Sequence, residues 1–135
     1  RGTQGGIAAA REHHHVVMTP GQYLYFDKRG TDSPDEPVSL NLSLPLEKIY
    51  GYDPAEGLSE EEQQYLLGVQ ANLWTEYIAT WPHAEYMLLP RLSALAEVGW
   101  SLDRKDYAGY LHRVRRLARI YDACGYNYAR HIFGE

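Results

Sequence analysis

Two short stretches pair an aromatic ring with a carboxylate two positions further along: Trp74 with Glu76, and Tyr25 with Asp27. Side chains at every second position of an extended strand point the same way, so each ring and its carboxylate would face one side. A flat ring covers the C–H surface of a sugar, and a carboxylate accepts hydrogen bonds from sugar hydroxyls. These residue types at this spacing therefore indicate a carbohydrate-binding cleft.

Each pair also has an interpretation that requires no ligand. Trp74 could be a buried residue at the end of a strand, with Glu76 capping the next helix, as is common in α/β folds. Tyr25 could be a half-buried packing residue and Asp27 a turn former. Spacing alone leaves both interpretations open. Two loops that each offer an aromatic ring and a carboxylate make the cleft a better hypothesis than either loop would alone.

Other clusters of polar residues are weaker candidates. His13-His14-His15 offers metal-binding side chains, but neighbours in sequence point in different directions and cannot all reach one ion. Asp35-Glu36 has the composition of a catalytic acid pair, yet it lies between prolines with no strand in front to hold it, so we expect a solvated loop. Glu60, Glu61 and Glu62 follow Ser59 and are expected to open a short helix, whose dipole favours negative charge there. We expect neither a metal site nor a cofactor site.

The surrounding sequence predicts the elements that must position the two pairs. Val16–Met18 is a short apolar run that ends before Pro20, and residues 68–74 form a second strand-like run. A long loop is expected from Lys28 to Pro37. Helical patterns occupy residues 7–14, entered through a flexible Gly5-Gly6, and residues 45–50, 85–100 and 103–124. This order of strands and helices predicts an α/β fold.

The last predicted helix has the clearest pattern. Apolar residues recur at helical spacing between Tyr107 and Tyr121, and arginines occupy the other faces. Asp103 is the expected N-cap, and Gly125 is expected to end the helix. We expect the arginines to form a solvated face, because the chain as a whole is acidic.

The composition fits one folded unit that does not bind nucleic acid and has no membrane span. The chain has 135 residues, 44% of them hydrophobic, which is enough for one core of ordinary size. Its net charge of −5 disfavours nucleic acid, because phosphate binding requires clustered Lys and Arg. No apolar run is long enough to span a bilayer. Cys124 is alone, so no disulfide can form within the chain. Arg1 stands where an initiator Met would be, and we expect a piece of a longer protein.

The chain closely resembles the C-terminal part of the catalytic (β/α)₈ barrel of family-twenty glycoside hydrolases, the β-N-acetylhexosaminidases, and most of all their bacterial members. The resemblance covers nearly the whole chain, and its second half is the more diagnostic. The stretches that carry it are Arg1–Ala10, Val16–Pro20, Tyr25–Asp27, Leu44–Tyr50, Gly68–Glu76 and Leu89–Ser101.

The resemblance implies an activity, and it implies that the catalytic residues lie outside this segment. In the family, the 2-acetamido carbonyl of the terminal sugar attacks its own anomeric carbon, and the reaction proceeds with retention. An Asp-Glu pair at the end of an earlier barrel strand orients the acetamide and protonates the leaving oxygen. Asp35-Glu36 does not match the context of that pair. We therefore expect no catalytic residue in this segment, with the acid/base pair upstream.

The resemblance also assigns roles to the two ring-carboxylate pairs. Tyr25 matches a tyrosine that donates to the acetamido carbonyl, and Asp27 matches a carboxylate that binds neighbouring hydroxyls. Trp74 matches the indole under the terminal sugar, and Glu76 the carboxylate that accepts from its outer hydroxyls. Many members carry a Trp in the segment after Tyr-x-Asp, whereas residues 38–44 contain none.

The implied fold is an α/β fragment of a TIM barrel. Residues 1–135 would be the C-terminal segment of the catalytic domain, with the last two βα units in residues 1–101 and a C-terminal helix in residues 102–135. The implied partner is the terminal N-acetylhexosamine of glycans, and the implied compartment is periplasmic or extracellular. An isolated fragment would expose strand edges, so we expect it to be inactive, to associate with itself or rearrange, and to draw most of its core from the final helices. The alternative is a non-catalytic helical module for protein contact or carbohydrate binding.

Overall fold

A computed structural model describes residues 2–133, apart from the side chain of Arg104. Arg1 of the first resembling stretch, and the last two positions of the expected segment, lie outside the described residues. In chain order the elements are α1 (Gln4–Arg11), β1 (Val16–Met18), α2 (Gly21–Leu24), β2 (Lys28–Arg29), β3 (Leu40–Ser43), α3 (Leu46–Tyr50), α4 (Glu60–Gln63), β4 (Leu66–Val69), α5 (Trp81–Leu88), α6 (Arg91–Trp100), η1 (Leu102–Arg104), α7 (Tyr107–Cys124) and η2 (Arg130–Phe133).

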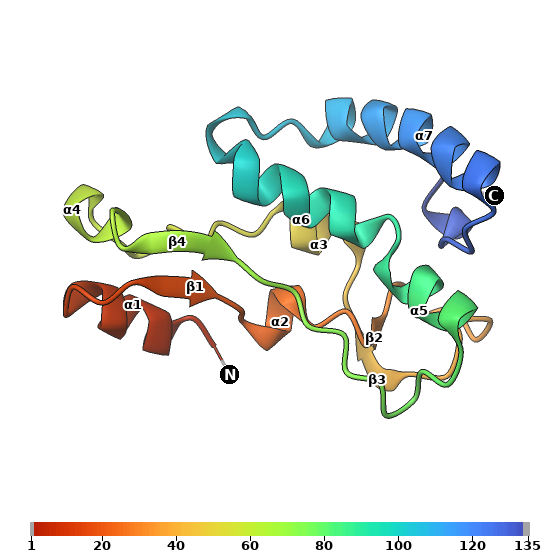
Figure 1. Cartoon of the computed structure of the whole chain (residues 1–135), viewed down its shortest axis with the longest axis horizontal. Coiled ribbons are helices and arrows are strands. Elements are labelled where there is room, and N and C mark those ends of the chain that lie inside the picture. Colours follow the sequence, from red (N-terminus) through yellow and green to blue (C-terminus); the bar gives the residue numbers. More distant parts are fainter. Residues whose placement is uncertain (1, 134–135) are drawn as a thin grey trace.

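Strands β1 and β4 form a parallel pair, with Val17 opposite Gly68 and Met18 opposite Val69. Helix α1 packs along β1 and α6 along β4, so the two strands lie between helices (Figure 1). A parallel pair whose strands are joined through helices is the repeating unit of an α/β barrel. The architecture is therefore that of an α/β barrel fragment, as the sequence predicts.

The second predicted strand is shorter than expected. Strand β4 covers Leu66–Val69, whereas the strand-like run predicted from the sequence covers residues 68–74. Gly68 has a φ of 150°, a conformation that side chains rarely adopt. Trp74 and Glu76 consequently lie in the loop after the strand. The argument from strand alternation does not hold for these two residues.

The long loop expected from Lys28 begins two residues later. Lys28 and Arg29 form strand β2, which pairs in parallel with β3, and Lys28 lies opposite Leu40. The connection between these strands then runs through residues 30–39. Its turn-forming Ser and Pro residues fit that connection, but they do not predict that β2 and β3 pair at its two ends.

The short helices mostly follow their local signals. Helix α3 buries Leu46, Ile49 and Tyr50 on one face, as predicted. Ser59 caps α4 by accepting from the backbone N–H of Glu62, whose carboxylate accepts from the backbone N–H of Ser59 in return. Helix α1 begins at Gln4, so the two glycines expected to precede it lie within it.

The region predicted as one helix over residues 85–100 forms two. Helix α5 begins at Trp81, capped by Thr80, and α6 begins at Arg91. Pro90 lies between them, because it has no N–H to donate and its ring clashes with the preceding turn of a helix. The N-cap predicted for the last helix is also wrong: Asp106, not Asp103, accepts from Gly109 N–H. Gly125 ends α7 with a φ of 71°, as predicted.

The main hydrophobic cluster draws mostly on the first half of the chain. Helix α1, strand β1 and the region from α2 to Leu58 supply most of its buried members, and α6 and α7 supply Ala94, Leu95, Val98, Tyr110 and Val114. The expectation that the final helices provide most of the core is therefore wrong, because α7 is a one-sided cover. None of the helices in residues 2–133 is long and apolar enough to cross a membrane.

Candidate functional site

Backbone hydrogen bonds join the two loops that carry the ring-carboxylate pairs. Phe26 N–H donates to the carbonyl of Asn72 at 2.8 Å, and Asn72 N–H donates to the carbonyl of Leu24 at 2.9 Å. Tyr25 and Asn72 thus form a parallel bridge beyond the carboxyl ends of β1 and β4. This extension of the ladder places residues 25–27 beside residues 72–76.

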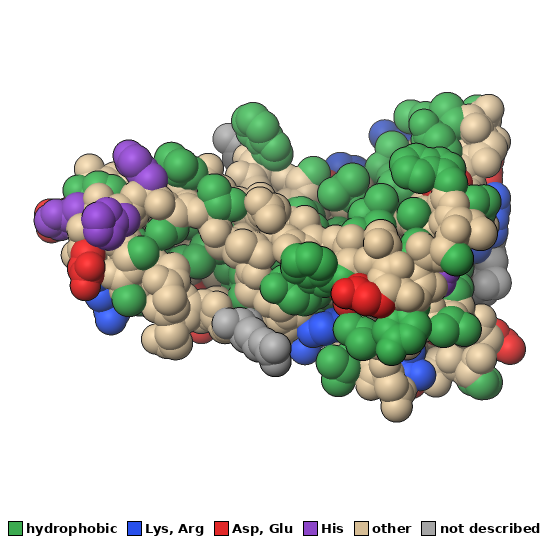
Figure 2. All heavy atoms as spheres, turned by 60° about the horizontal axis from the view of Figure 1, so that its bottom comes forward, with side chains coloured by type: hydrophobic (Ala, Val, Ile, Leu, Met, Phe, Trp, Pro, Cys, Tyr) green, Lys and Arg blue, Asp and Glu red, His purple; other side chains and the backbone are tan. Residues whose placement is uncertain are grey.

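All four predicted site residues line one hollow of about 380 Å³. Its walls are formed by Tyr25, Asp27, Leu40, Trp74, Glu76 and Tyr77. Figure 2 shows acidic and hydrophobic side chains next to each other on the face turned forward, a mixture that suits a ligand with both hydroxyls and C–H surface. The hollow lies at the carboxyl ends of the parallel strands, where α/β barrels place their sites.

The rings of Tyr25 and Trp74 are in edge-to-face contact. The centroids of Tyr25 and Trp74 lie 5.8 Å apart, with 66° between the ring planes. Trp74 is 46% exposed, so the interpretation as a buried strand-end residue is wrong. The alternative for Glu76 is also wrong, because Thr80 caps α5 and Glu76 is an exposed side chain on the loop.

Asp27 is a buried carboxylate at the wall of the hollow, with only 5% of its surface exposed. Burial raises its pKa and the charge of Glu76 raises it further, whereas a backbone hydrogen bond at Asp27, Lys28 and Arg91 oppose the rise. Its Oδ1 has no hydrogen-bond partner among the residues that the structure describes. This oxygen is an acceptor available to a ligand hydroxyl.

Arg91 is a contributor that the sequence patterns missed. Its guanidinium is buried beneath the site and donates to the carbonyls of Phe26 and Lys28, at 2.6 and 2.7 Å. Burial lowers its pKa to about 10, and the nearby carboxylates of Glu36 and Asp27 oppose that fall. A charged residue directly after Pro90, within an apolar run, was the signal that could have identified it.

The acidic pair Asp35-Glu36 does not belong to this hollow. Asp35 is exposed, as expected of a solvated loop, but the side chain of Glu36 is only 3% exposed. Glu36 accepts from the hydroxyl of Thr31 at 2.7 Å and lies 3.7 Å from the ring of His131. The expectation of solvation is therefore wrong for Glu36, because the C-terminal segment covers it.

The histidine run lies at the opposite end of the molecule. Figure 2 shows histidines gathered where α1 and α4 lie, and His13 and His15 pack against Tyr65 with centroids 5.1 and 5.7 Å apart. Within residues 2–133, no group of three or more His, Cys, Asp or Glu side chains could hold a metal ion. Packing on one tyrosine gives His13 and His15 a structural role.

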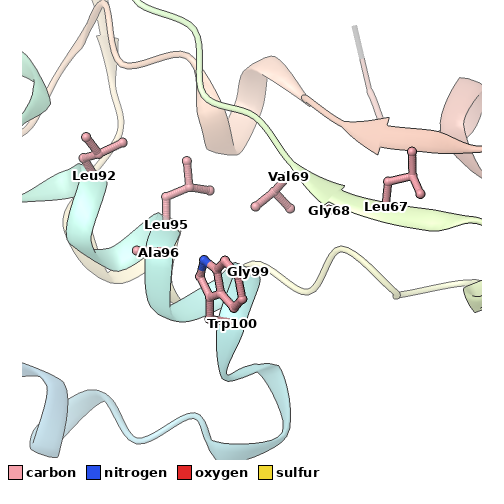
Figure 3. Close-up of a pocket in the computed structure, with 8 residues that line it drawn as sticks. All are labelled: Leu67, Gly68, Val69, Leu92, Leu95, Ala96, Gly99 and Trp100. Carbon is pink, nitrogen blue, oxygen red and sulfur yellow. The ribbon is translucent and has the colours of Figure 1, made fainter.

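Another hollow, of about 420 Å³, is lined by residues of β4 and α6 (Figure 3). Its lining consists of Leu67, Gly68, Val69, Leu92, Leu95, Ala96, Gly99 and Trp100. None of these side chains can titrate, attack or bind a metal, so this hollow has no means of doing chemistry. The hollow around Tyr25 and Trp74 is therefore the candidate site.

Parallel strands flanked by helices, with a hollow at their carboxyl ends, define the class of α/β barrels. Residues 1–103 match the family model described as glycosyl hydrolase family 20, catalytic domain, and the chain belongs to this family. A β-hexosaminidase from Porphyromonas gingivalis is 43% identical over 131 residues, which are 95% of this chain and 17% of that protein. The family resemblance seen in the sequence is thus confirmed.

Solved structures give the same result. A GH20 exo-β-N-acetylglucosaminidase from Vibrio harveyi, solved with N-acetylglucosamine, is similar with a TM-score of 0.86 and 32% identity, covering 95% of this chain and 21% of that chain. The GH20 β-N-acetylhexosaminidase from Streptomyces coelicolor is similar with a TM-score of 0.82 and 29% identity, covering 95% and 26%. The chain therefore spans 17–26% of the length of these relatives.

Proposed function

We propose that this chain is the terminal-sugar-binding part of an exo-β-N-acetylhexosaminidase, which removes N-acetylhexosamine from the ends of glycans. The observation that carries the proposal is the convergence of Tyr25, Asp27, Trp74 and Glu76 on one hollow. Family membership supports it, as does the N-acetylglucosamine bound by the relative from Vibrio harveyi. Residues 1–101 supply the last two βα units of the catalytic barrel, and residues 102–135 a C-terminal helical segment.

Each of the four side chains has a part that its chemistry allows. The indole of Trp74 covers the apolar face of the sugar ring, and Glu76 accepts hydrogen bonds from the outer hydroxyls. The hydroxyl of Tyr25 donates to the acetamido carbonyl, while Asp27 accepts from a neighbouring hydroxyl through its unpartnered oxygen. Together they hold the acetamide against the anomeric carbon, which is the geometry that an internal nucleophile requires.

The bond-breaking step proposed here is the one that the family resemblance implies. The acetamido oxygen attacks the anomeric carbon, the glycosidic bond breaks, and a carboxylic acid protonates the departing oxygen. Water then opens the cyclic intermediate, and the product retains its configuration. In this proposal the proton transfers belong to an Asp-Glu pair outside residues 1–135, so this segment alone binds sugar without hydrolysing it.

The test is the kinetics of the full-length protein that contains this chain, with a nitrophenyl N-acetylglucosaminide as substrate. Glu76→Gln and Trp74→Ala should each lower kcat/KM by about 10–100-fold, equivalent to about 1.5–3 kcal/mol of lost binding in the transition state. Glu61→Gln, on the exposed face of α4, is the matched control and should change nothing. Unchanged kinetics in both site variants would overturn the assignment of the hollow. Sugar binding without any turnover by the full-length protein would support the non-catalytic module instead.

A further inference from the structure

Arg91 binds the backbone on both sides of Asp27, the buried residue in the wall of the hollow. It is the first residue of α6 and only 4% exposed, and its guanidinium packs against the backbone of residues 26–28. One terminal nitrogen donates to the carbonyl before Asp27 and the other to the carbonyl after it, at 2.6 and 2.7 Å. The guanidinium also lies 5.2 Å from the ring centroid of Phe26.

The guanidinium of Arg91 is also bound to the end of α5. Nε of Arg91 donates to the carbonyl of Met87 at 2.8 Å, in the last turn of α5. Carbonyls at a helix end lack partners within the helix, and Arg91 satisfies one of them. One side chain thus fixes the backbone at Asp27 to the junction of α5 and α6. Met87 is itself buried, so this anchor has little freedom to shift.

The guanidinium also affects the charge of the site. The groups that act on Asp27 are Lys28 on β2, Glu76 on the loop after β4, and Arg91 on α6. Glu36, Asp27 and Tyr86 act on Arg91 in turn. The positive charge of Arg91 favours the ionised form of Asp27, which burial and Glu76 disfavour.

We infer that Arg91 is a positioning residue for the sugar-binding carboxylate, acting through the backbone of Asp27 without touching the ligand. The inference rests on the proposed function of the hollow. Two parallel donors in a planar fork can hold both carbonyls that flank one residue, whereas an ammonium group offers a single point of attachment. Movement of this backbone would displace the Asp27 carboxylate from the wall of the hollow.

The test uses the full-length protein, the same nitrophenyl substrate and three variants. Arg91→Lys keeps the charge but loses the fork, so KM should rise by about tenfold with a smaller change in kcat. The acid limb of the pH profile of kcat/KM should stay in place. Arg91→Met also removes the charge, so the pKa of Asp27 should rise and the acid limb should move to higher pH. In an Asp27→Asn background, Arg91→Lys should change KM by less than about twofold, because residues that act through each other are not additive.

Arg119 is the matched control. It is exposed on α7, so Arg119→Lys and Arg119→Met should leave KM and the pH profile unchanged. A KM of the wild-type size in Arg91→Lys would overturn the positioning role alone. Equal losses with and without Asp27, or failure of Arg91→Lys to fold, would assign Arg91 to stability and overturn it as well. An absence of turnover by the wild-type protein would overturn the proposed function, and the positioning role with it.

Discussion

The edge of one aromatic ring meets the face of the other where Tyr25 and Trp74 touch, with 66° between their planes. Two rings set at this angle form a corner, so a sugar lying on one ring meets the rim of the other. The corner depends on the backbone bridge between Tyr25 and Asn72, which links the two loops directly. The two loops that carry the rings are therefore joined by main-chain bonds, which no replacement other than proline removes.

Replacing Tyr25 by Phe should separate the role of the hydroxyl from that of the ring. Tyr25→Phe keeps the contact with Trp74 and loses only the donor proposed for the acetamido carbonyl. We expect kcat/KM of the full-length protein to fall by about tenfold or more, while the melting temperature stays unchanged. Steady-state kinetics and thermal unfolding check this. Tyr126→Phe, an exposed tyrosine after α7, is the control, and equal effects of the two changes would contradict the assignment.

The ion pair between α6 and α7 should make stability depend on pH. Glu97 accepts two hydrogen bonds from Arg113, at 2.8 and 2.7 Å, and a third from Tyr50 at 3.1 Å. The Arg113 hydrogen bonds are the main reason that the pKa of Glu97 is lowered. A carboxylate with a lowered pKa stabilises the folded state above its unfolded pKa, and that contribution disappears as the pH falls through the folded pKa.

Glu97→Gln should therefore lower the melting temperature by a few degrees at neutral pH. This difference in melting temperature between the variant and the wild type should become smaller below about pH 4.5. Thermal unfolding across a pH series measures it. In an Arg113→Gln background the same change should have little effect, because its main partner is already gone. A gap that stays constant down to pH 3 would show that ionisation of Glu97 does not contribute.

The two glycines inside α1 should respond to alanine in opposite directions. A Cβ on Gly5 would meet nothing within 4 Å, so Gly5→Ala should stabilise the protein by up to about 0.5–1 kcal/mol through helix propensity. A Cβ on Gly6 would lie 2.5 Å from the sulfur of Met18, which is buried in the core. Gly6→Ala should destabilise by about 1–3 kcal/mol. Urea unfolding compares the pair, and stabilisation by both would show that Met18 moves without cost.

The isolated chain should associate with a second copy through the apolar hollow between β4 and α6 (Figure 3). Trp100 is 91% exposed and Leu67 is 66% exposed, and burying such surface is the main driving force for association. Trp100→Ser should shift the sedimentation of residues 1–135 toward the monomer. Ile120→Ser removes an exposed apolar group from α7 and should leave it unchanged. A compact wild-type monomer at all concentrations would contradict this expectation.

Features that depend on neighbouring residues could be predicted from the sequence. Ser59 caps α4 and Gly125 ends α7, because each acts on backbone groups within one turn. The spacing of rings and carboxylates singled out four of the six residues that line the hollow, although Trp74 and Glu76 lie beyond the strand that the spacing argument assumed. The break at Pro90 was underestimated, because a proline is also compatible with a kinked helix. Arg91 could not be placed at the site, since the two carbonyls that it binds there, of Lys28 and Phe26, lie 63 and 65 residues away in the chain.

The bridge between Tyr25 and Asn72 also has an evolutionary consequence. The two halves of the hollow are encoded 47 positions apart but are joined by main-chain bonds that any residue except proline could make. Two exposed segments of the connecting stretch, the turn at residues 32–35 and helix α4, can therefore lengthen, shorten or change sequence without loosening the corner. Changes in these exposed segments would leave the pairing of the two loops, and the hollow between them, as they are.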